Sequence, residues 1–220
     1  MTDTTTPPPD LDPAAEEAVF YHEAALNASW TGIRLALGAL SLGFGSFIFA
    51  FFYLKSLNSH GLWYPAGFHG PQPWAGATVT GLIVVSAAVQ TVVLQRIKGG
   101  HKAAWLRGAV VALVLGVAAV GLEIGQLLKL PFFPGASGFA SVFTGFWPVY
   151  IVIALAALTW LEILIMRCRA IPEISLVEQP PTFAEAFAVQ RFQSSLSAFT
   201  LIWNFMAVVT LFFFLLFYVL

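Results

Sequence analysis

Two carboxylates, Glu123 and Glu162, stand inside long apolar stretches of this sequence. An ionisable group in such a stretch is costly to bury, so each is a candidate for binding a proton or another cation. A local interpretation competes with this one. Glu123 lies near the end of its stretch, and Glu162 lies about one helical turn before Arg167, with which it could pair at the membrane surface. Both interpretations are open.

The histidines and the cysteine predict no metal or haem site. Haem ligation inside a membrane needs paired histidines within helices, and a zinc or copper site needs several imidazoles or thiolates at close spacing. Cys168 has no second thiol with which to form a disulfide, a zinc site or an iron–sulfur cluster. The four histidines fall in the leader or in loops, at His22, His60, His69 and His101. No Ser, His and Asp arrangement, Walker loop or dinucleotide fingerprint is present, so the sequence predicts no catalytic centre.

The elements that position these residues are predicted membrane-spanning helices. The sequence is 59% hydrophobic and only 10% charged, which would leave a soluble globule without a wetted surface. A bilayer core of about 30 Å requires about 20 apolar residues of helix. The predicted fold is therefore an all-α integral membrane bundle of five transmembrane helices within residues 29–220. Their predicted ranges are about 30–54, 74–93, 103–128, 139–166 and 199–220.

Residues 1–28 form a polar leader without the basic start and early apolar run of a cleaved signal peptide. Thr, Pro and Asp favour disorder in its first half, whereas 13–27 could form a short helix at the membrane surface. The net charge of −1 suggests no nucleic-acid partner.

Basic residues predict the orientation of the bundle. Most of them flank the second and fourth connections, at Arg96, Lys98, Lys102, Arg107, Arg167, Arg169 and Arg191. The other two loops carry only Lys55 and Lys129. By the positive-inside rule, the two basic loops, the N-terminus and Arg34 lie on the cytoplasmic side, and the C-terminus lies outside.

Small residues recur four positions apart in two of the predicted helices. They are Gly108, Ala112 and Gly116 in the third helix and Ser41 and Gly45 in the first. Such spacing lets helices approach closely in lipid, where packing replaces the hydrophobic effect. The two stripes fit a subunit interface and packing inside the bundle equally well.

Three segments follow one another in a recognisable order. The first contains FAFFYLKS before a loop of Gly, Trp and Pro, the second opens with SVF and TGF, and the third is LIWNFMAVVTLFFFLLFYVL. In this order and spacing they resemble subunit III of the haem-copper oxidases, in the short form that lacks the family's first two helices. The resemblance covers nearly all of the chain after residue 28.

The chain also departs from the pattern of that family. In the alignment, Ser41 stands where the family usually has a membrane glutamate, and Trp147 stands where histidines follow TGF. Trp203 matches the tryptophan of the last helix, but Asn204 replaces its histidine and Ala207 its acidic residue. The resemblance therefore implies a divergent branch that keeps the scaffold.

The resemblance implies a non-catalytic subunit with no redox cofactor of its own. Haem and copper are then expected in oxidase subunits I and II, beside which this chain would pack in the bacterial cytoplasmic membrane, with phospholipid bound to it. It would support proton uptake and oxygen reduction by a cytochrome c or quinol oxidase, with a respiratory supercomplex as a further partner. The candidate residues for lipid binding or proton traffic are Arg34, Glu123, Glu162, Arg167, Trp203 and Asn204.

Other interpretations of the sequence stay open. The subunit III-like accessory protein of a nitric oxide reductase has helices of the same pattern. A small transporter or channel would instead bind an ion at Glu123 and Glu162. A membrane anchor for an unrelated respiratory complex is a third alternative.

Overall fold

The computed structural model describes residues 13–58, 61–171 and 183–220. Its long helices are α1 (Pro13–Leu57), α2 (Pro73–Lys98), α3 (Lys102–Leu127), α4 (Gly138–Ala170) and α5 (Phe183–Phe214), and α5 continues into the π-helix η2 (Leu215–Val219). Each of the five long helices contains a segment long and apolar enough to cross a membrane. The predicted all-helical, multi-pass fold is confirmed at this level.

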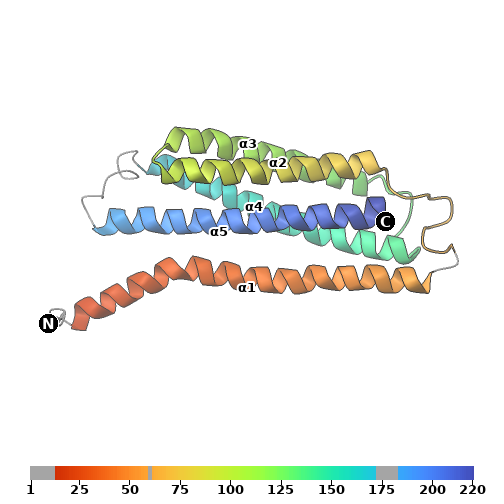
Figure 1. The fold of residues 1–220 in the computed structure, drawn as a ribbon, viewed down its shortest axis with the longest axis horizontal. Helices are drawn as coiled ribbons and strands as arrows, with labels where there is room; N and C mark the ends of the chain where they lie inside the picture. Colours follow the sequence, from red (N-terminus) through yellow and green to blue (C-terminus); the bar gives the residue numbers. More distant parts are fainter. Residues whose placement is uncertain (1–12, 59–60, 172–182) are drawn as a thin grey trace, which may run out of the picture.

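The helices run side by side along the length of the molecule (Figure 1). The hairpin of α2 and α3 lies on one side, α1 lies on the other, and α4 and α5 lie between them. The N-terminal part of α1 bends away from the bundle, and it lies at the opposite end from the C-terminus. An odd number of spans requires this separation of the two ends.

The first helix is one continuous element where the sequence predicts two. It begins at Pro13 and runs through Ala28 and Ser29 without interruption, and its apolar part begins at Trp30. The junction contains neither Pro nor Gly, so no residue there breaks the helical hydrogen bonding. The first half of the polar leader, 1–12, lies outside the described residues.

The fifth helix begins at Phe183, well before its predicted start near Phe199. Its early turns are amphipathic, because Gln190 and Arg191 are exposed while Phe192 and Leu196 are buried. Polar residues on the outer face lower the local hydropathy and hide such turns from a search for apolar stretches. The connection at 172–182 lies outside the described residues.

Aromatic rings fill the core at the end of the bundle where α1 joins α2. Phe146 of α4 stacks on Phe213 of α5, with 3.7 Å between the ring centroids. Phe139, at the start of α4, contacts the ring of Trp63 from the α1–α2 loop, and its backbone N–H donates to the Trp63 carbonyl at 3.2 Å. These contacts fasten the loop to α4.

The small residues of α3 pack against neighbouring helices inside the bundle. Gly108 packs against Val93 of α2, and a Cβ at Gly116 would lie 2.5 Å from Leu158 Cδ2 of α4. The glycines are therefore needed for close approach of these helices. The α1 stripe is different, because no atom lies within 4 Å of a Cβ placed at Gly45.

Candidate functional site

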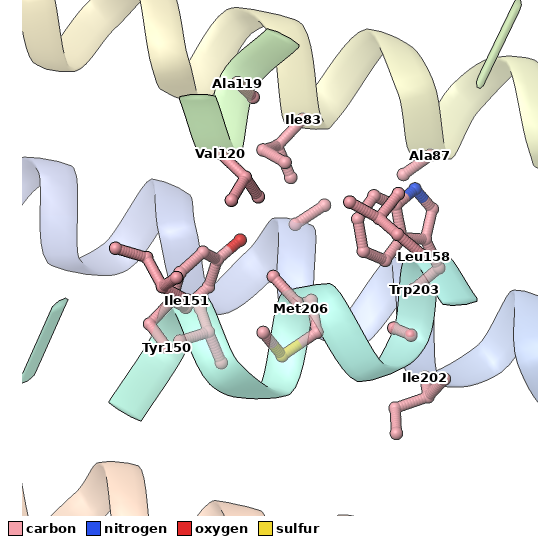
Figure 2. Close-up of a cluster of buried hydrophobic side chains, with 14 of the residues drawn as sticks. Ile83, Ala87, Ala119, Val120, Tyr150, Ile151, Leu158, Ile202, Trp203 and Met206 are labelled. Atoms are coloured by element: carbon pink, nitrogen blue, oxygen red, sulfur yellow. The ribbon is translucent and has the colours of Figure 1, made fainter. Parts of the chain in front are cut away.

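Trp203 links three helices through a buried chain of hydrogen bonds. Its indole Nε1 donates to Ser86 Oγ of α2 at 3.0 Å, and that hydroxyl donates to the carbonyl of Ala112 in α3 at 2.7 Å. Figure 2 shows the indole nitrogen turned toward α2 beside Ala87. The indole N–H, the serine hydroxyl and the carbonyl in this series all have hydrogen-bond partners, which suits a residue that fixes the positions of the helices.

One residue further along α5, Asn204 also connects α5 to α2. Its amide Nδ2 donates to Thr91 Oγ1 at 3.0 Å, and the Thr91 hydroxyl donates to the Ala87 carbonyl of its own helix at 2.9 Å. Both sequence-predicted residues of α5 thus hold α5 against α2.

Three other sequence-predicted residues lie on the outside of the bundle. Arg34 is exposed, with its guanidinium 5.9 Å from the centre of the Trp30 ring. Glu162 and Arg167 are both exposed on α4. Five positions correspond to about 140° of rotation around a helix, so these two side chains leave α4 on different faces. The described residues include no ion pair between them.

Glu123 is the one buried carboxylate among the described side chains. It is 1% exposed, and neither carboxyl oxygen has a hydrogen-bond partner within the described chain. It is buried inside the bundle near the end of α3. Ionisable groups in membrane helices usually take this inward position, where they meet partners or ligands.

Oxygen atoms from neighbouring elements gather near Glu123. The hydroxyls of Tyr150 of α4 and Tyr218 of η2 flank the part of α3 that contains Glu123. The Tyr150 hydroxyl points toward Val120, one turn before Glu123 (Figure 2), and is hydrogen-bonded to the hydroxyl of Thr210. The Tyr218 hydroxyl donates to Oε1 of Gln126 at 3.3 Å. We call this set the oxygen cluster; it comprises Glu123, Gln126, Tyr150, Thr210 and Tyr218.

The π-helix η2 places Tyr218 in this cluster. The residues Leu216, Phe217 and Tyr218 are all buried in succession, which the wider turn of a π-helix permits. The ring of Tyr218 lies against Gly76 of α2, where a Cβ would be 2.7 Å from three ring carbons. Sequence reasoning did not single out Tyr218 or Gly76, because a π-turn at the end of an apolar helix leaves no hydropathy signal.

The described residues contain no group of three or more His, Cys, Asp or Glu side chains that could hold a metal ion. His60, which shares a loop with His69, lies outside the described residues, and His69 is exposed. Cys168 is buried in α4. The oxygen cluster therefore contains one carboxyl group, and its other members are hydroxyls and one amide.

Comparison of the sequence with protein-family models finds no match. Comparison with curated proteins likewise finds no significant match.

Proposed function

We propose that this chain is a non-catalytic, subunit III-type component of a bacterial respiratory haem-copper oxidase. In this proposal it packs beside subunit I, with subunit II and a respiratory supercomplex as further partners. It contributes stability, bound phospholipid and support for proton uptake, while haem and copper stay in the partner subunits. The ordered resemblance of the three segments supports this assignment, and the main structural support is the free face of α1.

The free face of α1 has the character of a helix-docking surface. Ile33, Phe44 and Phe51 are buried against the bundle. The opposite side is exposed and carries Gly38, Ser41, Leu42, Gly45 and Phe49. No atom lies within 4 Å of a Cβ at Gly38 or Gly45. Small residues against which no helix of the described chain packs leave room for a helix of another subunit.

The basic end of the bundle supports lipid retention and the cytoplasmic orientation of that end. The Lys102 ammonium donates to the carbonyls of Arg169 and Ile171, so the start of α3 and the end of α4 lie together. Exposed cations around this junction are Arg96, Lys98, Arg107, Arg167 and Arg169. Such a group attracts the phosphate head groups of anionic lipids. The positive-inside rule then puts the N-terminus inside and the C-terminus outside.

The test is to purify the tagged full-length chain from native membranes in mild detergent. Reduced-minus-oxidised visible spectra and mass identification of partners are then recorded. Haem a or o together with peptides of subunits I and II is the expected result. Haem b and c alone would move the chain to a nitric oxide reductase, and a colourless preparation without partners would favour a transporter.

A pair of variants tests the α1 face itself. Gly45→Leu fills the space on the free face and should reduce recovery of the partner subunits several-fold. Gly121→Leu is the control, because Gly121 is equally open and lies on α3, on the far side of the bundle from α1. Equal partner recovery from the two variants would contradict docking through α1.

A further inference from the structure

We propose that the oxygen cluster around Glu123 binds one sodium ion inside the bundle. This inference does not depend on the identity of the partner subunits. It begins from the two bare oxygens of Glu123, which is 1% exposed. Buried polar atoms in native proteins are almost always paired, so a carboxylate without partners indicates a ligand position.

The charge of the cluster selects a monovalent ion. Glu123 supplies a single negative charge once its proton is displaced, and the other members are hydroxyls and one amide. Among the described residues no basic side chain forms a hydrogen bond with Glu123. One positive charge neutralises this site, whereas a divalent ion would leave an uncompensated charge in a medium of low dielectric constant.

The chemical type of the ligand atoms favours a hard cation. Carboxylate, amide and hydroxyl oxygens are the ligands that such ions prefer, and the cluster offers no sulfur or imidazole. The hydroxyl of Tyr218 and Oε1 of Gln126 are 3.3 Å apart, which is long for an O–H···O hydrogen bond. Two oxygens held about 2.4 Å from one cation at a right angle lie about 3.4 Å apart. This hydrogen-bonded pair is therefore spaced about as two ligands of one ion would be.

The fold is shaped around this site in two independent ways. The π-turn of η2 brings Tyr218 inward, and such turns recur at functional sites. Gly76 leaves the space that the Tyr218 ring occupies. The elements packed against α3 contribute Tyr150 from α4, Tyr218 from η2 and Gly76 from α2 at this level. Among the described residues, Tyr150 and Tyr218 are the titratable groups that these elements bring to this level.

The experiment measures thermal unfolding of the purified full-length protein in detergent or nanodiscs. The Tm is compared in sodium chloride and in choline chloride at equal ionic strength and pH, and then across a pH series in choline chloride. An ion that binds the folded state raises the Tm in proportion to the logarithm of its concentration. The variants are Glu123→Gln, Tyr218→Phe and, as the matched control, the exposed carboxylate variant Glu162→Gln.

Sodium should raise the Tm of the wild type and of Glu162→Gln by the same amount. The rise should vanish in Glu123→Gln and shrink in Tyr218→Phe, which keeps the ring and loses only the hydroxyl. If acidification produces this pattern and sodium does not, Glu123 is a protonated carboxyl without a bound metal cation, and the proposal is overturned. A Tm that shows no Glu123-dependent response to sodium overturns the proposal. If Glu123→Gln does not fold, an unchanged response in Tyr218→Phe overturns it as well.

Discussion

The indole of Trp203 and the hydroxyl of Ser86 form a hydrogen bond of 3.0 Å in the middle of the bundle, where both residues are fully buried. The Ser86 hydroxyl in turn donates a hydrogen bond to the Ala112 carbonyl at 2.7 Å. Ser86 therefore connects α2, α3 and α5 through hydrogen bonds. In lipid, where no water competes, such links help to define how helices pack.

Ser86→Ala should lower the free energy of unfolding by about 1–2 kcal/mol, because the indole N–H then stays buried without an acceptor. Reversible unfolding in mixed micelles with a denaturing detergent measures this loss. Ser46→Ala is the control, since the Ser46 hydroxyl is exposed and bonds only to the Leu42 carbonyl of its own helix. Similar losses in the two variants would contradict the linking role of Ser86.

Gly116→Ala should destabilise the bundle by about 1–3 kcal/mol through overpacking. The added Cβ would lie 2.5 Å from Leu158 Cδ2 and 3.1 Å from the Trp203 ring, both held in the core. Gly121→Ala, on the open side of the same helix, should be neutral or stabilising by up to about 1 kcal/mol. The same unfolding assay compares them, and the prediction fails if Gly116→Ala is as stable as Gly121→Ala.

Phe213→Ala should cost about 3–5 kcal/mol, because it empties a position stacked on Phe146 in the aromatic core. The neighbouring Phe212→Ala removes the same atoms from a ring that is 43% exposed, and should cost less than about 1 kcal/mol. Unfolding midpoints of the two variants in one detergent provide the comparison. A reversed order would mean that Phe212, and not Phe213, carries the packing.

Gly76→Ala should displace the Tyr218 ring, because the new Cβ would lie 2.7 Å from its carbons. We expect destabilisation of about 1–3 kcal/mol and, if the cation proposal holds, a weaker stabilisation by the bound ion. Gly81→Ala, with open space around it on the same helix, is the control. Thermal unfolding with and without the ion measures both effects, and a sodium response equal to that of Gly81→Ala would separate Gly76 from the site.

Hydropathy was enough to predict the existence of five long apolar helices, because lipid imposes a length and composition that few other environments demand. It could not find the early turns of α5, where Gln190 and Arg191 face outward. Nor could it decide which small-residue stripe packs inside the bundle. Gly116 and Gly45 look alike in sequence, and only the positions of Leu158 and Trp203 distinguish them.

The candidate site was predictable only in part. Glu123 stood out because a carboxylate in an apolar helix is unusual, but its neighbours lie 27 to 95 positions further along the chain, at Tyr150, Thr210 and Tyr218. The sequence carries no signal for such long-range contacts, and it gives none for a π-turn. Glu162 stood out for the same reason as Glu123, yet it is exposed on α4.

The one-sided attachment of α1 bears on how the protein is made. Its partners in the bundle are α4 and α5, which leave the ribosome after both helices of the α2–α3 hairpin. The hairpin can pack as soon as α3 is inserted, since its two helices are neighbours in the chain. The apolar part of α1 therefore lacks its partner helices in the bundle until α4 and α5 have been inserted. A nascent α1 with an open small-residue face is thus free to meet another protein before its own bundle is complete.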